Sequence, residues 1–404
     1  MRTPITPISW AYIAFIGIIL LTLIGLIVYF TTIRSQPSPA NRMILVNNAT
    51  ANAAVYPKQM PNRKSLRDYL QNKVGNLPAD VLSLSNFHVM TANLAGAFSP
   101  VNNAAFDSKA IQYALHAGAR GLIFDVWPDT AKSANMGPIL QFRSSDASIE
   151  SLSPYSLDLV TALQMVQKYG FADSANPANN DPLFLFFRFR GNPTINTLNG
   201  TANAISMALE QYRLSSVYSS TDKNPLYSTP IDAFQNKMIV LSNQSGILNG
   251  QRTRFADYVN NPTQPTTPVT AISTPGQINA LGDVNTTKVQ TDTSQRNILT
   301  CAPLPEDTAN SESNGWDWKG AMNTGVQLCG INLWAMDSGL NAYLGPEVFG
   351  TYSFLIKPEN STEGFTSSIE GFKSPVPLRY RIERIPGPTP VKNPGYGDGT
   401  VNVK

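Results

Sequence analysis

The chain has 404 residues and a formal net charge of +3, which is too small a positive charge to indicate nucleic-acid binding. Lys, Arg, Asp and Glu make up only 14% of the residues, against about 25% in typical soluble domains. We therefore expect a neutral surface rich in uncharged hydrogen-bonding groups. Between the two ends, the chain is long enough for one large single-core domain.

Residues 10–30 form an uncharged and mostly apolar stretch. As an α-helix this stretch would extend roughly 31 Å, close to the ~30 Å thickness of the membrane hydrocarbon. Trp10 and Tyr29 stand near its ends, where aromatic side chains favour the membrane interface. A cleavable signal peptide is the alternative, but its apolar core would run only about 7–15 residues. The sequence predicts a single-pass transmembrane anchor over 1–34 and a juxtamembrane spacer over 35–83.

The sequence does not decide on which side of the membrane the rest of the chain lies. Arg2 precedes the apolar stretch, and Arg34 and Arg42 follow it, so the positive-inside rule is close to a tie. Glycosylation sequons occur about as often as chance predicts in a chain this rich in Asn, Ser and Thr. They begin at Asn48, Asn199, Asn243, Asn285 and Asn360.

The two cysteines, Cys301 and Cys329, leave two alternatives. They could form a disulfide, or Cys329, in an apolar strand-like run, could be a buried thiol. The cysteines therefore do not show whether the chain folds in an oxidising or a reducing compartment.

From about residue 84, apolar strand-like runs alternate with amphipathic helical patterns. Leu183–Phe187 is a nearly continuous apolar run, which is typical of a parallel strand buried on both faces. This alternation predicts a parallel α/β architecture. The predicted strands are 87–91, 122–127, 183–187, 237–241, 326–334 and 351–356. The predicted helices are 64–70, with Ser65 as a candidate N-cap, 108–117, 154–169 and 201–214.

Two stretches break this pattern. Residues 249–315 are rich in Thr, Asn, Pro, Gln and Ser, which predicts a long polar insertion. The last thirty or so residues hold many prolines and glycines, a composition that cannot build a core. The segment 361–404 is therefore predicted to be an extended arm.

Three separated segments resemble the phosphoinositide-specific phospholipase C family. Phe87–Asn93 lies where the family has its first-strand S-S-H-N-T-Y motif. The second segment resembles the family's G-C-R-x-x-E-L-D-x-W block and matches it at Gly118, Arg120, Asp125 and Trp127. The third, which is the most specific, resembles the closing block and keeps Gln327, Asn332, Lys357 and Pro358. The resemblance implies a distorted TIM-type (β/α)8 barrel over 84–360, with its site at the carboxyl ends of the strands.

The family cleaves a phosphodiester with two histidines, one acting as a base and the other as an acid. By the resemblance, the first falls at Ala92 and the second near Phe142 or Arg143, and none of these side chains can shuttle a proton. The chain has only two histidines, His88 and His116. No catalytic residue is therefore predicted.

The two histidines have simpler interpretations. His88 shares the strand parity of Ala92, so it is expected to point into the barrel as a satisfied interior histidine. His116 is expected to be a surface or packing residue.

In calcium-dependent members, the resemblance places the metal ligands at Asn93, Ile123, Asp125 and Arg188. Calcium takes about 6–8 oxygen ligands, whereas isoleucine offers none and arginine is a cation. No metal and no other cofactor is therefore predicted.

Asn93, Asp125, Arg188 and Arg190 outline a relict pocket. Both arginines lie on one face of a strand and could bind a phosphate with paired donors. Alternatively, they pair internally with Asp125, with Asp129 or with a carboxylate of the C-terminal tail.

These observations favour a membrane-anchored, catalytically inactive phospholipase C-like barrel that acts as a structural or interaction module. Its partners would be a lipid membrane, through residues 10–30, and a protein, through the arm or the insertion. One setting that suits this architecture is a large virus particle, in which the module links membrane and shell. Two alternatives remain: a phosphodiesterase with an altered mechanism based on His88, Asp125 or Asp129, and binding of an inositol phosphate or lipid headgroup without turnover.

Overall fold

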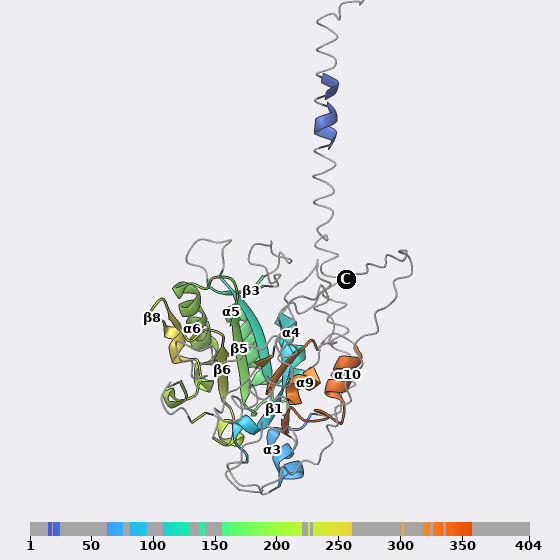
Figure 1. Cartoon of the computed structure of the whole chain (residues 1–404), viewed down its shortest axis with the longest axis vertical. Helices are drawn as coiled ribbons and strands as arrows, with labels where there is room; N and C mark the ends of the chain where they lie inside the picture. The colour runs from blue at the N-terminus through green and yellow to red at the C-terminus, as the bar shows by residue number, and fades with distance from the viewer. Residues whose placement is uncertain are drawn as a thin grey trace, which may run out of the picture. The chain divides into compact units, whose positions relative to one another are not determined.

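The computed structural model consists of two units, Met1–Asn48 and Ala49–Lys404. The residues that it describes are 15–17, 19–24, 63–75, 81–94, 108–128, 137–141, 156–219, 225–226, 229–260, 301–302, 318–323, 326–333 and 337–357. Within these residues, the second unit is built on one sheet of nine strands with helices packed on it (Figure 1).

The sheet contains a parallel row in the order β6–β5–β2–β1–β10–β9. Three short strands add antiparallel pairs: β11 with β1, β3 with β2, and β4 with β3. The strands are β1 (Phe87–Asn93), β2 (Gly121–Trp127), β3 (Ile139–Gln141), β4 (Ser156–Asp158), β5 (Leu183–Phe189), β6 (Met238–Ser242), β9 (Cys301–Ala302), β10 (Leu328–Ile331) and β11 (Phe354–Ile356). A separate hairpin joins β7 (Ile247–Leu248) to β8 (Gln251–Arg252).

The helices are α3 (Leu66–Tyr69), α4 (Ser108–His116), α5 (Leu159–Gly170), α6 (Ile195–Leu209), α9 (Trp318–Asn323) and α10 (Ser338–Leu344). All of the helices except α3 come after a strand in the chain, and α5 packs between α4 and α6. Short turns of other helix types are η1 (Leu70–Val74), η2 (Leu84–Asn86), η4 (Glu210–Tyr212), η5 (Ser216–Ser219), η6 (Ile231–Phe234) and η7 (Arg254–Asp257).

The packing of α5 shows which side chains of the sheet face the helices and which face the inner side. Gly170 lets α5 approach closely, because a Cβ there would lie 3.3 Å from Leu183 and 3.7 Å from Leu115 of α4. Odd-numbered residues of β5 therefore face the helices. Since side chains alternate along a strand, Phe186 and Arg188 face the opposite, inner side.

The described sheet agrees with the predicted parallel α/β architecture, and all six predicted strands are present within a few residues. Two predicted helices start elsewhere. Residues 156–158 form β4, and α5 begins only at Leu159, because Asp158 caps it by accepting from the Thr161 N–H. α6 begins at Ile195, ahead of the predicted 201, because Thr194 and Thr197 form a capping box.

The folded body begins earlier than the predicted boundary at 84. Ser65 caps α3 as predicted, but Leu66 and Tyr69 are buried in the core. The Tyr69 hydroxyl accepts a hydrogen bond from the Ile356 N–H at 2.9 Å. The described residues 63–75 of the predicted spacer therefore belong to the folded body.

The predicted insertion also begins later than residue 249. Phe255 and Val259 are buried, and the Asn260 side chain accepts from the Val240 N–H in β6 at 2.8 Å. Residues 249–260 are therefore part of the body, and β9 pairs with β10 at the far end of the stretch. Residues 261–300, 303–315 and the arm lie outside the described residues.

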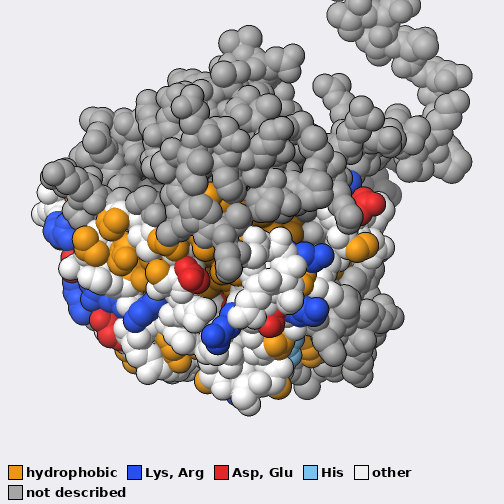
Figure 2. Space-filling view, turned by 90° about the horizontal axis from the view of Figure 1, so that it is seen from below, with side chains coloured by type: hydrophobic (Ala, Val, Ile, Leu, Met, Phe, Trp, Pro, Cys, Tyr) orange, Lys and Arg blue, Asp and Glu red, His pale blue; other side chains and the backbone are white. Residues whose placement is uncertain are grey.

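No helix in the described part of the chain combines the length and apolar character needed to cross a membrane. Of the predicted anchor, only 15–17 and 19–24 are described, and they are helical. Cys329 is a buried thiol whose Sγ lies 3.8 Å from the Trp318 carbonyl oxygen. On the face of the molecule seen in Figure 2, charged side chains are scattered among uncharged groups, in line with the low charged content.

Candidate functional site

The predicted site residues gather near the carboxyl ends of β1, β2 and β5. The register pairs Asn93 with Ile123, Ile123 with Phe186, and Asp125 with Arg188. Paired residues on adjacent strands point to the same face, so all of these side chains lie on the inner face. Asn93, Asp125 and Arg188 are 4%, 8% and 6% exposed, and Ile123 is fully buried. These side chains are therefore largely shielded from solvent at the carboxyl ends of the strands, a position that we call the mouth.

Arg188 is engaged by Asp125. Its Nη2 donates to Asp125 Oδ2 at 2.6 Å, and its Nε donates to Asp125 Oδ1. This two-pronged arrangement satisfies both carboxylate oxygens and is the strongest geometry for such a pair. Of the two roles that the sequence leaves open for Arg188, the structure therefore has internal pairing.

Arg190 lies against an aromatic ring at the end of β5. Its guanidinium carbon is 5.8 Å from the centre of the Trp127 ring, within the range of a cation–π contact. Gly191 follows with a φ of 63°, and a Cβ there would come within 3.4 Å of Trp127. The glycine thus lets the chain leave β5 directly over the indole.

Asn93 has a buried acceptor. Among the described residues, no group donates a hydrogen bond to its Oδ1. Such unsatisfied buried atoms are few in folded proteins and cost free energy. Asn93 is therefore the one predicted site residue whose acceptor lacks a described partner.

The two positions that the resemblance assigns to proton transfer do not form a catalytic pair. Ala92 is fully buried and pairs with Leu122, which pairs with Leu185 on the helix-facing side of the sheet. The second position, near Phe142 or Arg143, lies outside the described residues, as does Asp129.

His88 lies at the opposite end of β1 from the mouth. It lies five positions before Asn93, which corresponds to roughly 16 Å along an extended strand. It is 2% exposed, and its Nδ1 lies 2.9 Å from the Val326 carbonyl oxygen, to which it donates. Burial, and then the nearby Lys357, lower the pKa of His88 to about 3. The prediction of a satisfied histidine is confirmed, but its expected inward direction is wrong, because its parity places it with Ala92 on the helix-facing side.

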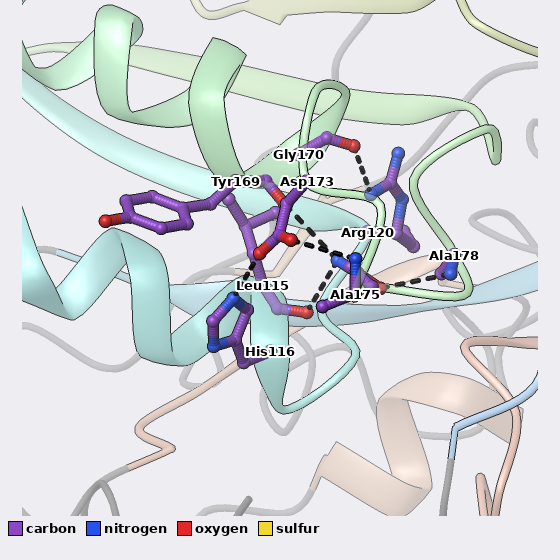
Figure 3. A network of polar contacts seen from close by, with 9 residues as sticks. Leu115, His116, Arg120, Tyr169, Gly170, Asp173, Ala175 and Ala178 are labelled. Atoms are coloured by element: carbon purple, nitrogen blue, oxygen red, sulfur yellow. Dashed lines mark hydrogen bonds and ion pairs between the residues drawn. The ribbon is translucent and has the colours of Figure 1, made fainter.

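His116 packs at the end of α4, as Figure 3 shows. Its Nε2 lies 2.9 Å from Asp173 Oδ2, and its ring meets Tyr169 edge-on. Its side chain is 30% exposed. The interpretation of His116 as a packing residue is confirmed.

Sequence reasoning gave no role to the buried arginine below the mouth. Arg120 is fully buried and donates to the carbonyl oxygens of Gly170, Asp181 and Pro182 (Figure 3 shows the first). Burial lowers its pKa to about 10. Burial also raises the pKa of Asp181, whose Oδ2 accepts from the Leu66 N–H at 2.9 Å, to about 7. The only sequence signal was the match of Arg120 to the family's second block, and the contacts make its role structural.

The residues at the mouth do not fit a calcium ion. Calcium needs about 6–8 oxygen ligands, and this position offers the Asn93 amide oxygen and a carboxylate already bonded to Arg188. Ile123 occupies the place of a third ligand. Within the described residues, no group of three or more His, Cys, Asp or Glu side chains could hold a metal ion.

Comparisons with known proteins place this geometry in a known fold. No family model matches the chain, and no curated protein matches it. The crystal structure of S. officinalis PLC21 superposes with a TM-score of 0.52 at 16% identity, covering 76% of this chain and 43% of that one. L. pealei PLC21 gives a TM-score of 0.50 at 16% identity, covering 74% of this chain and 41% of that one.

A calcium-dependent phosphoinositol-specific phospholipase C from Pseudomonas sp has a TM-score of 0.41 at 10% identity, covering 69% of this chain and 97% of that one. With 43% and 41% of the two PLC21 structures covered, this chain spans less than half of their length. The resemblance in the three sequence segments is confirmed at the level of architecture: the body of this chain has the fold of the phospholipase C-like phosphodiesterases.

Proposed function

We propose that this protein is a catalytically inactive phospholipase C-fold module that serves a structural or interaction role at a membrane. The observation that carries the proposal is the buried two-bond ion pair between Asp125 and Arg188. It occupies the inner face where the resemblance implies a metal site, and it leaves that position without an ionised oxygen for a cation.

The placement of the histidines supports the same proposal. General acid–base catalysis needs a titrating group within hydrogen-bond reach of the proton that it transfers. His88 is buried at the far end of β1, and His116 lies at the end of α4 against Asp173. Neither can reach a phosphodiester at the carboxyl ends of the strands.

A turnover assay tests this proposal. The full chain should release no inositol phosphate from phosphatidylinositol vesicles above a protein-free control, with calcium or with a chelator. The matched control is the double variant Asp125→Leu/Arg188→Met, which should stay folded. Release that is equal in the wild type and in this variant would be background, whereas release that the variant loses would sink the proposal.

Residues 10–30 would hold the module at the membrane, on the strength of their length and apolar composition. The arm over 361–404 or the polar insertion would then contact a protein partner, as in the membrane-to-shell contacts of a large virus particle. Flotation of the full chain with vesicles, lost when residues 1–34 are removed, is the expected result. Unchanged flotation after that removal would contradict the anchor.

Headgroup binding without turnover is a second candidate, and the buried Asn93 acceptor favours it. A hydroxyl of an inositol ring would satisfy that oxygen. In this case inositol phosphates should raise the melting temperature of the wild type, and Asn93→Leu should abolish the rise. No rise in the wild type would eliminate this candidate.

A phosphodiesterase with an altered mechanism receives less support. Its proposed bases are His88, which is buried far from the mouth, Asp125, which is bonded to Arg188, and Asp129, which lies outside the described residues. Hydrolysis lost in Asp129→Asn but kept in Asp125→Asn would revive it.

A further inference from the structure

Asn243, which follows β6, acts as a clamp on the end of β5. Its Oδ1 accepts from the Phe189 N–H at 2.8 Å, and its Nδ2 donates to the Phe189 carbonyl oxygen at 2.9 Å. The ladder between the two strands ends at Phe187 and Ser242, so the side chain extends the pairing by one step. Because the Phe189 N–H needs an acceptor and the Phe189 carbonyl oxygen needs a donor, the two bonds fix which atom of the Asn243 amide is oxygen and which is nitrogen.

The same asparagine begins a glycosylation sequon, Asn243-Gln244-Ser245. Both clamp bonds use one edge of the amide, on which Oδ1 and one Nδ2 hydrogen lie side by side. An N-linked sugar converts the side chain into a secondary amide, and such amides hold their substituent on the oxygen side in all but about one in a thousand cases. The sugar would therefore replace the hydrogen that Phe189 accepts. Glycosylation and the clamp exclude each other.

The residues of a second sequon are also hydrogen-bonded within the fold. Asn199 lies inside α6, and its Oδ1 accepts from the Arg254 N–H at 2.9 Å. The hydroxyl residue of this sequon, Thr201, is fully buried, and its Oγ1 donates to the Thr197 carbonyl oxygen. Both sequons within the described residues thus take part in hydrogen bonds of the folded body, and at Asn243 the bonded hydrogen is the one that a glycan would replace.

We infer that the folded body matures where asparagine is not glycosylated. Glycans are added to chains as they enter the secretory pathway, so a body made there would carry a sugar incompatible with the clamp. Combined with the proposed anchor at 10–30, on which this step rests, the inference places the body on the cytosolic side of the membrane. This inference gives the chain an orientation in the membrane, which the positive-inside rule alone does not decide.

The first test is translation of the full chain with endoplasmic-reticulum microsomes. Membrane-associated chain should show no mobility shift on endoglycosidase treatment, and its body should be open to added protease. A shift that disappears in Asn243→Gln, on a chain protected from protease, would overturn the inference. Chain that does not associate with the microsomes would sink the anchor proposal instead, and the second test would still apply to the clamp.

The second test forces the body into the lumen by putting a cleavable signal peptide in place of residues 1–34, so that no apolar anchor stops its transfer. The other sequons are removed by Asn→Gln at Asn48, Asn199, Asn285 and Asn360. We expect glycosylation at Asn243 and at least a tenfold loss of protease-resistant body. Ser245→Ala, which abolishes the sequon and keeps the clamp residue, should restore the yield. Glycosylated chain that is as protease-resistant as Ser245→Ala would contradict the clamp argument.

Discussion

Arg188 in β5 holds both carboxylate oxygens of Asp125 in β2 through two donors of one guanidinium. The two residues are partners in the strand register, so the sheet itself aligns them. Their side chains are 7% and 10% exposed. A pair this buried fills its position in the mouth and also makes each partner depend on the other.

Removing one partner of this pair should destabilise the fold strongly. Arg188→Ala leaves Asp125 as a buried charge without its partner, which costs about 3–5 kcal/mol in comparable pairs. Urea unfolding of the two proteins gives the difference directly. The matched control is the double variant Asp125→Leu/Arg188→Met, which replaces charge by apolar volume and should lie close to the wild type. A loss below about 1 kcal/mol in the single variant would show that the pair is solvated.

His88 should make stability depend on acid pH. Its pKa is lowered from an ordinary value near 6.5 to about 3 by burial. The unfolded chain therefore binds a proton between these values while the folded chain does not. Its contribution is fully present above about pH 6.5 and is lost at roughly 1.4 kcal/mol per pH unit as the pH falls toward 3.

Asp181 opposes this effect, so the measurement must be a difference. Its pKa is raised to about 7, so the folded state binds that proton more tightly and stability falls as the pH rises from about 4 to 7. His88→Gln keeps an N–H donor for Val326 and removes only the histidine titration. Subtracting its stability profile from that of the wild type should leave a slope below pH 6.5. Parallel profiles would mean that His88 is not buried in its neutral form.

Arg120 should not be replaceable by lysine. Its guanidinium reaches three backbone carbonyl groups that surround the start of β5. A lysine ammonium cannot span them in the same fork geometry, and each buried carbonyl left unpaired costs about 1–3 kcal/mol. We expect Arg120→Lys to lose several kcal/mol in urea unfolding, whereas Lys168→Arg on the exposed side of α5 should change little. Equal stability of the two variants would contradict this role.

The sequence predicts the strands well because the fold buries both of their faces. The run Leu183–Phe187 has no polar residue to confuse the pattern, and β5 is buried along its whole length. The boundaries were missed where local chemistry competes with hydrophobic periodicity. Asp158 stops the helical pattern by capping α5, and the residues before it form β4 instead.

The sequence predicts which residues make up the site, but it does not predict which of them bond to each other. Strand parity places Asp125 and Arg188 on one face, yet it cannot say whether the arginine meets a carboxylate or a ligand. The Asn243 clamp left no local signal, because its partner Phe189 lies 54 residues away. In the same way, only tertiary contact shows that Leu66 and Tyr69 belong to the core.

Among the described residues, no pair of proton-transfer groups lies at the mouth, and on this ground we propose that the protein does not cleave phosphodiesters. The most direct test is the pH profile of phosphatidylinositol hydrolysis by the full chain between pH 5 and 9, with calcium present. We predict a flat profile that coincides with the protein-free control. A bell-shaped profile reports an essential acid and base, and finding one would show that the protein is an active phosphodiesterase.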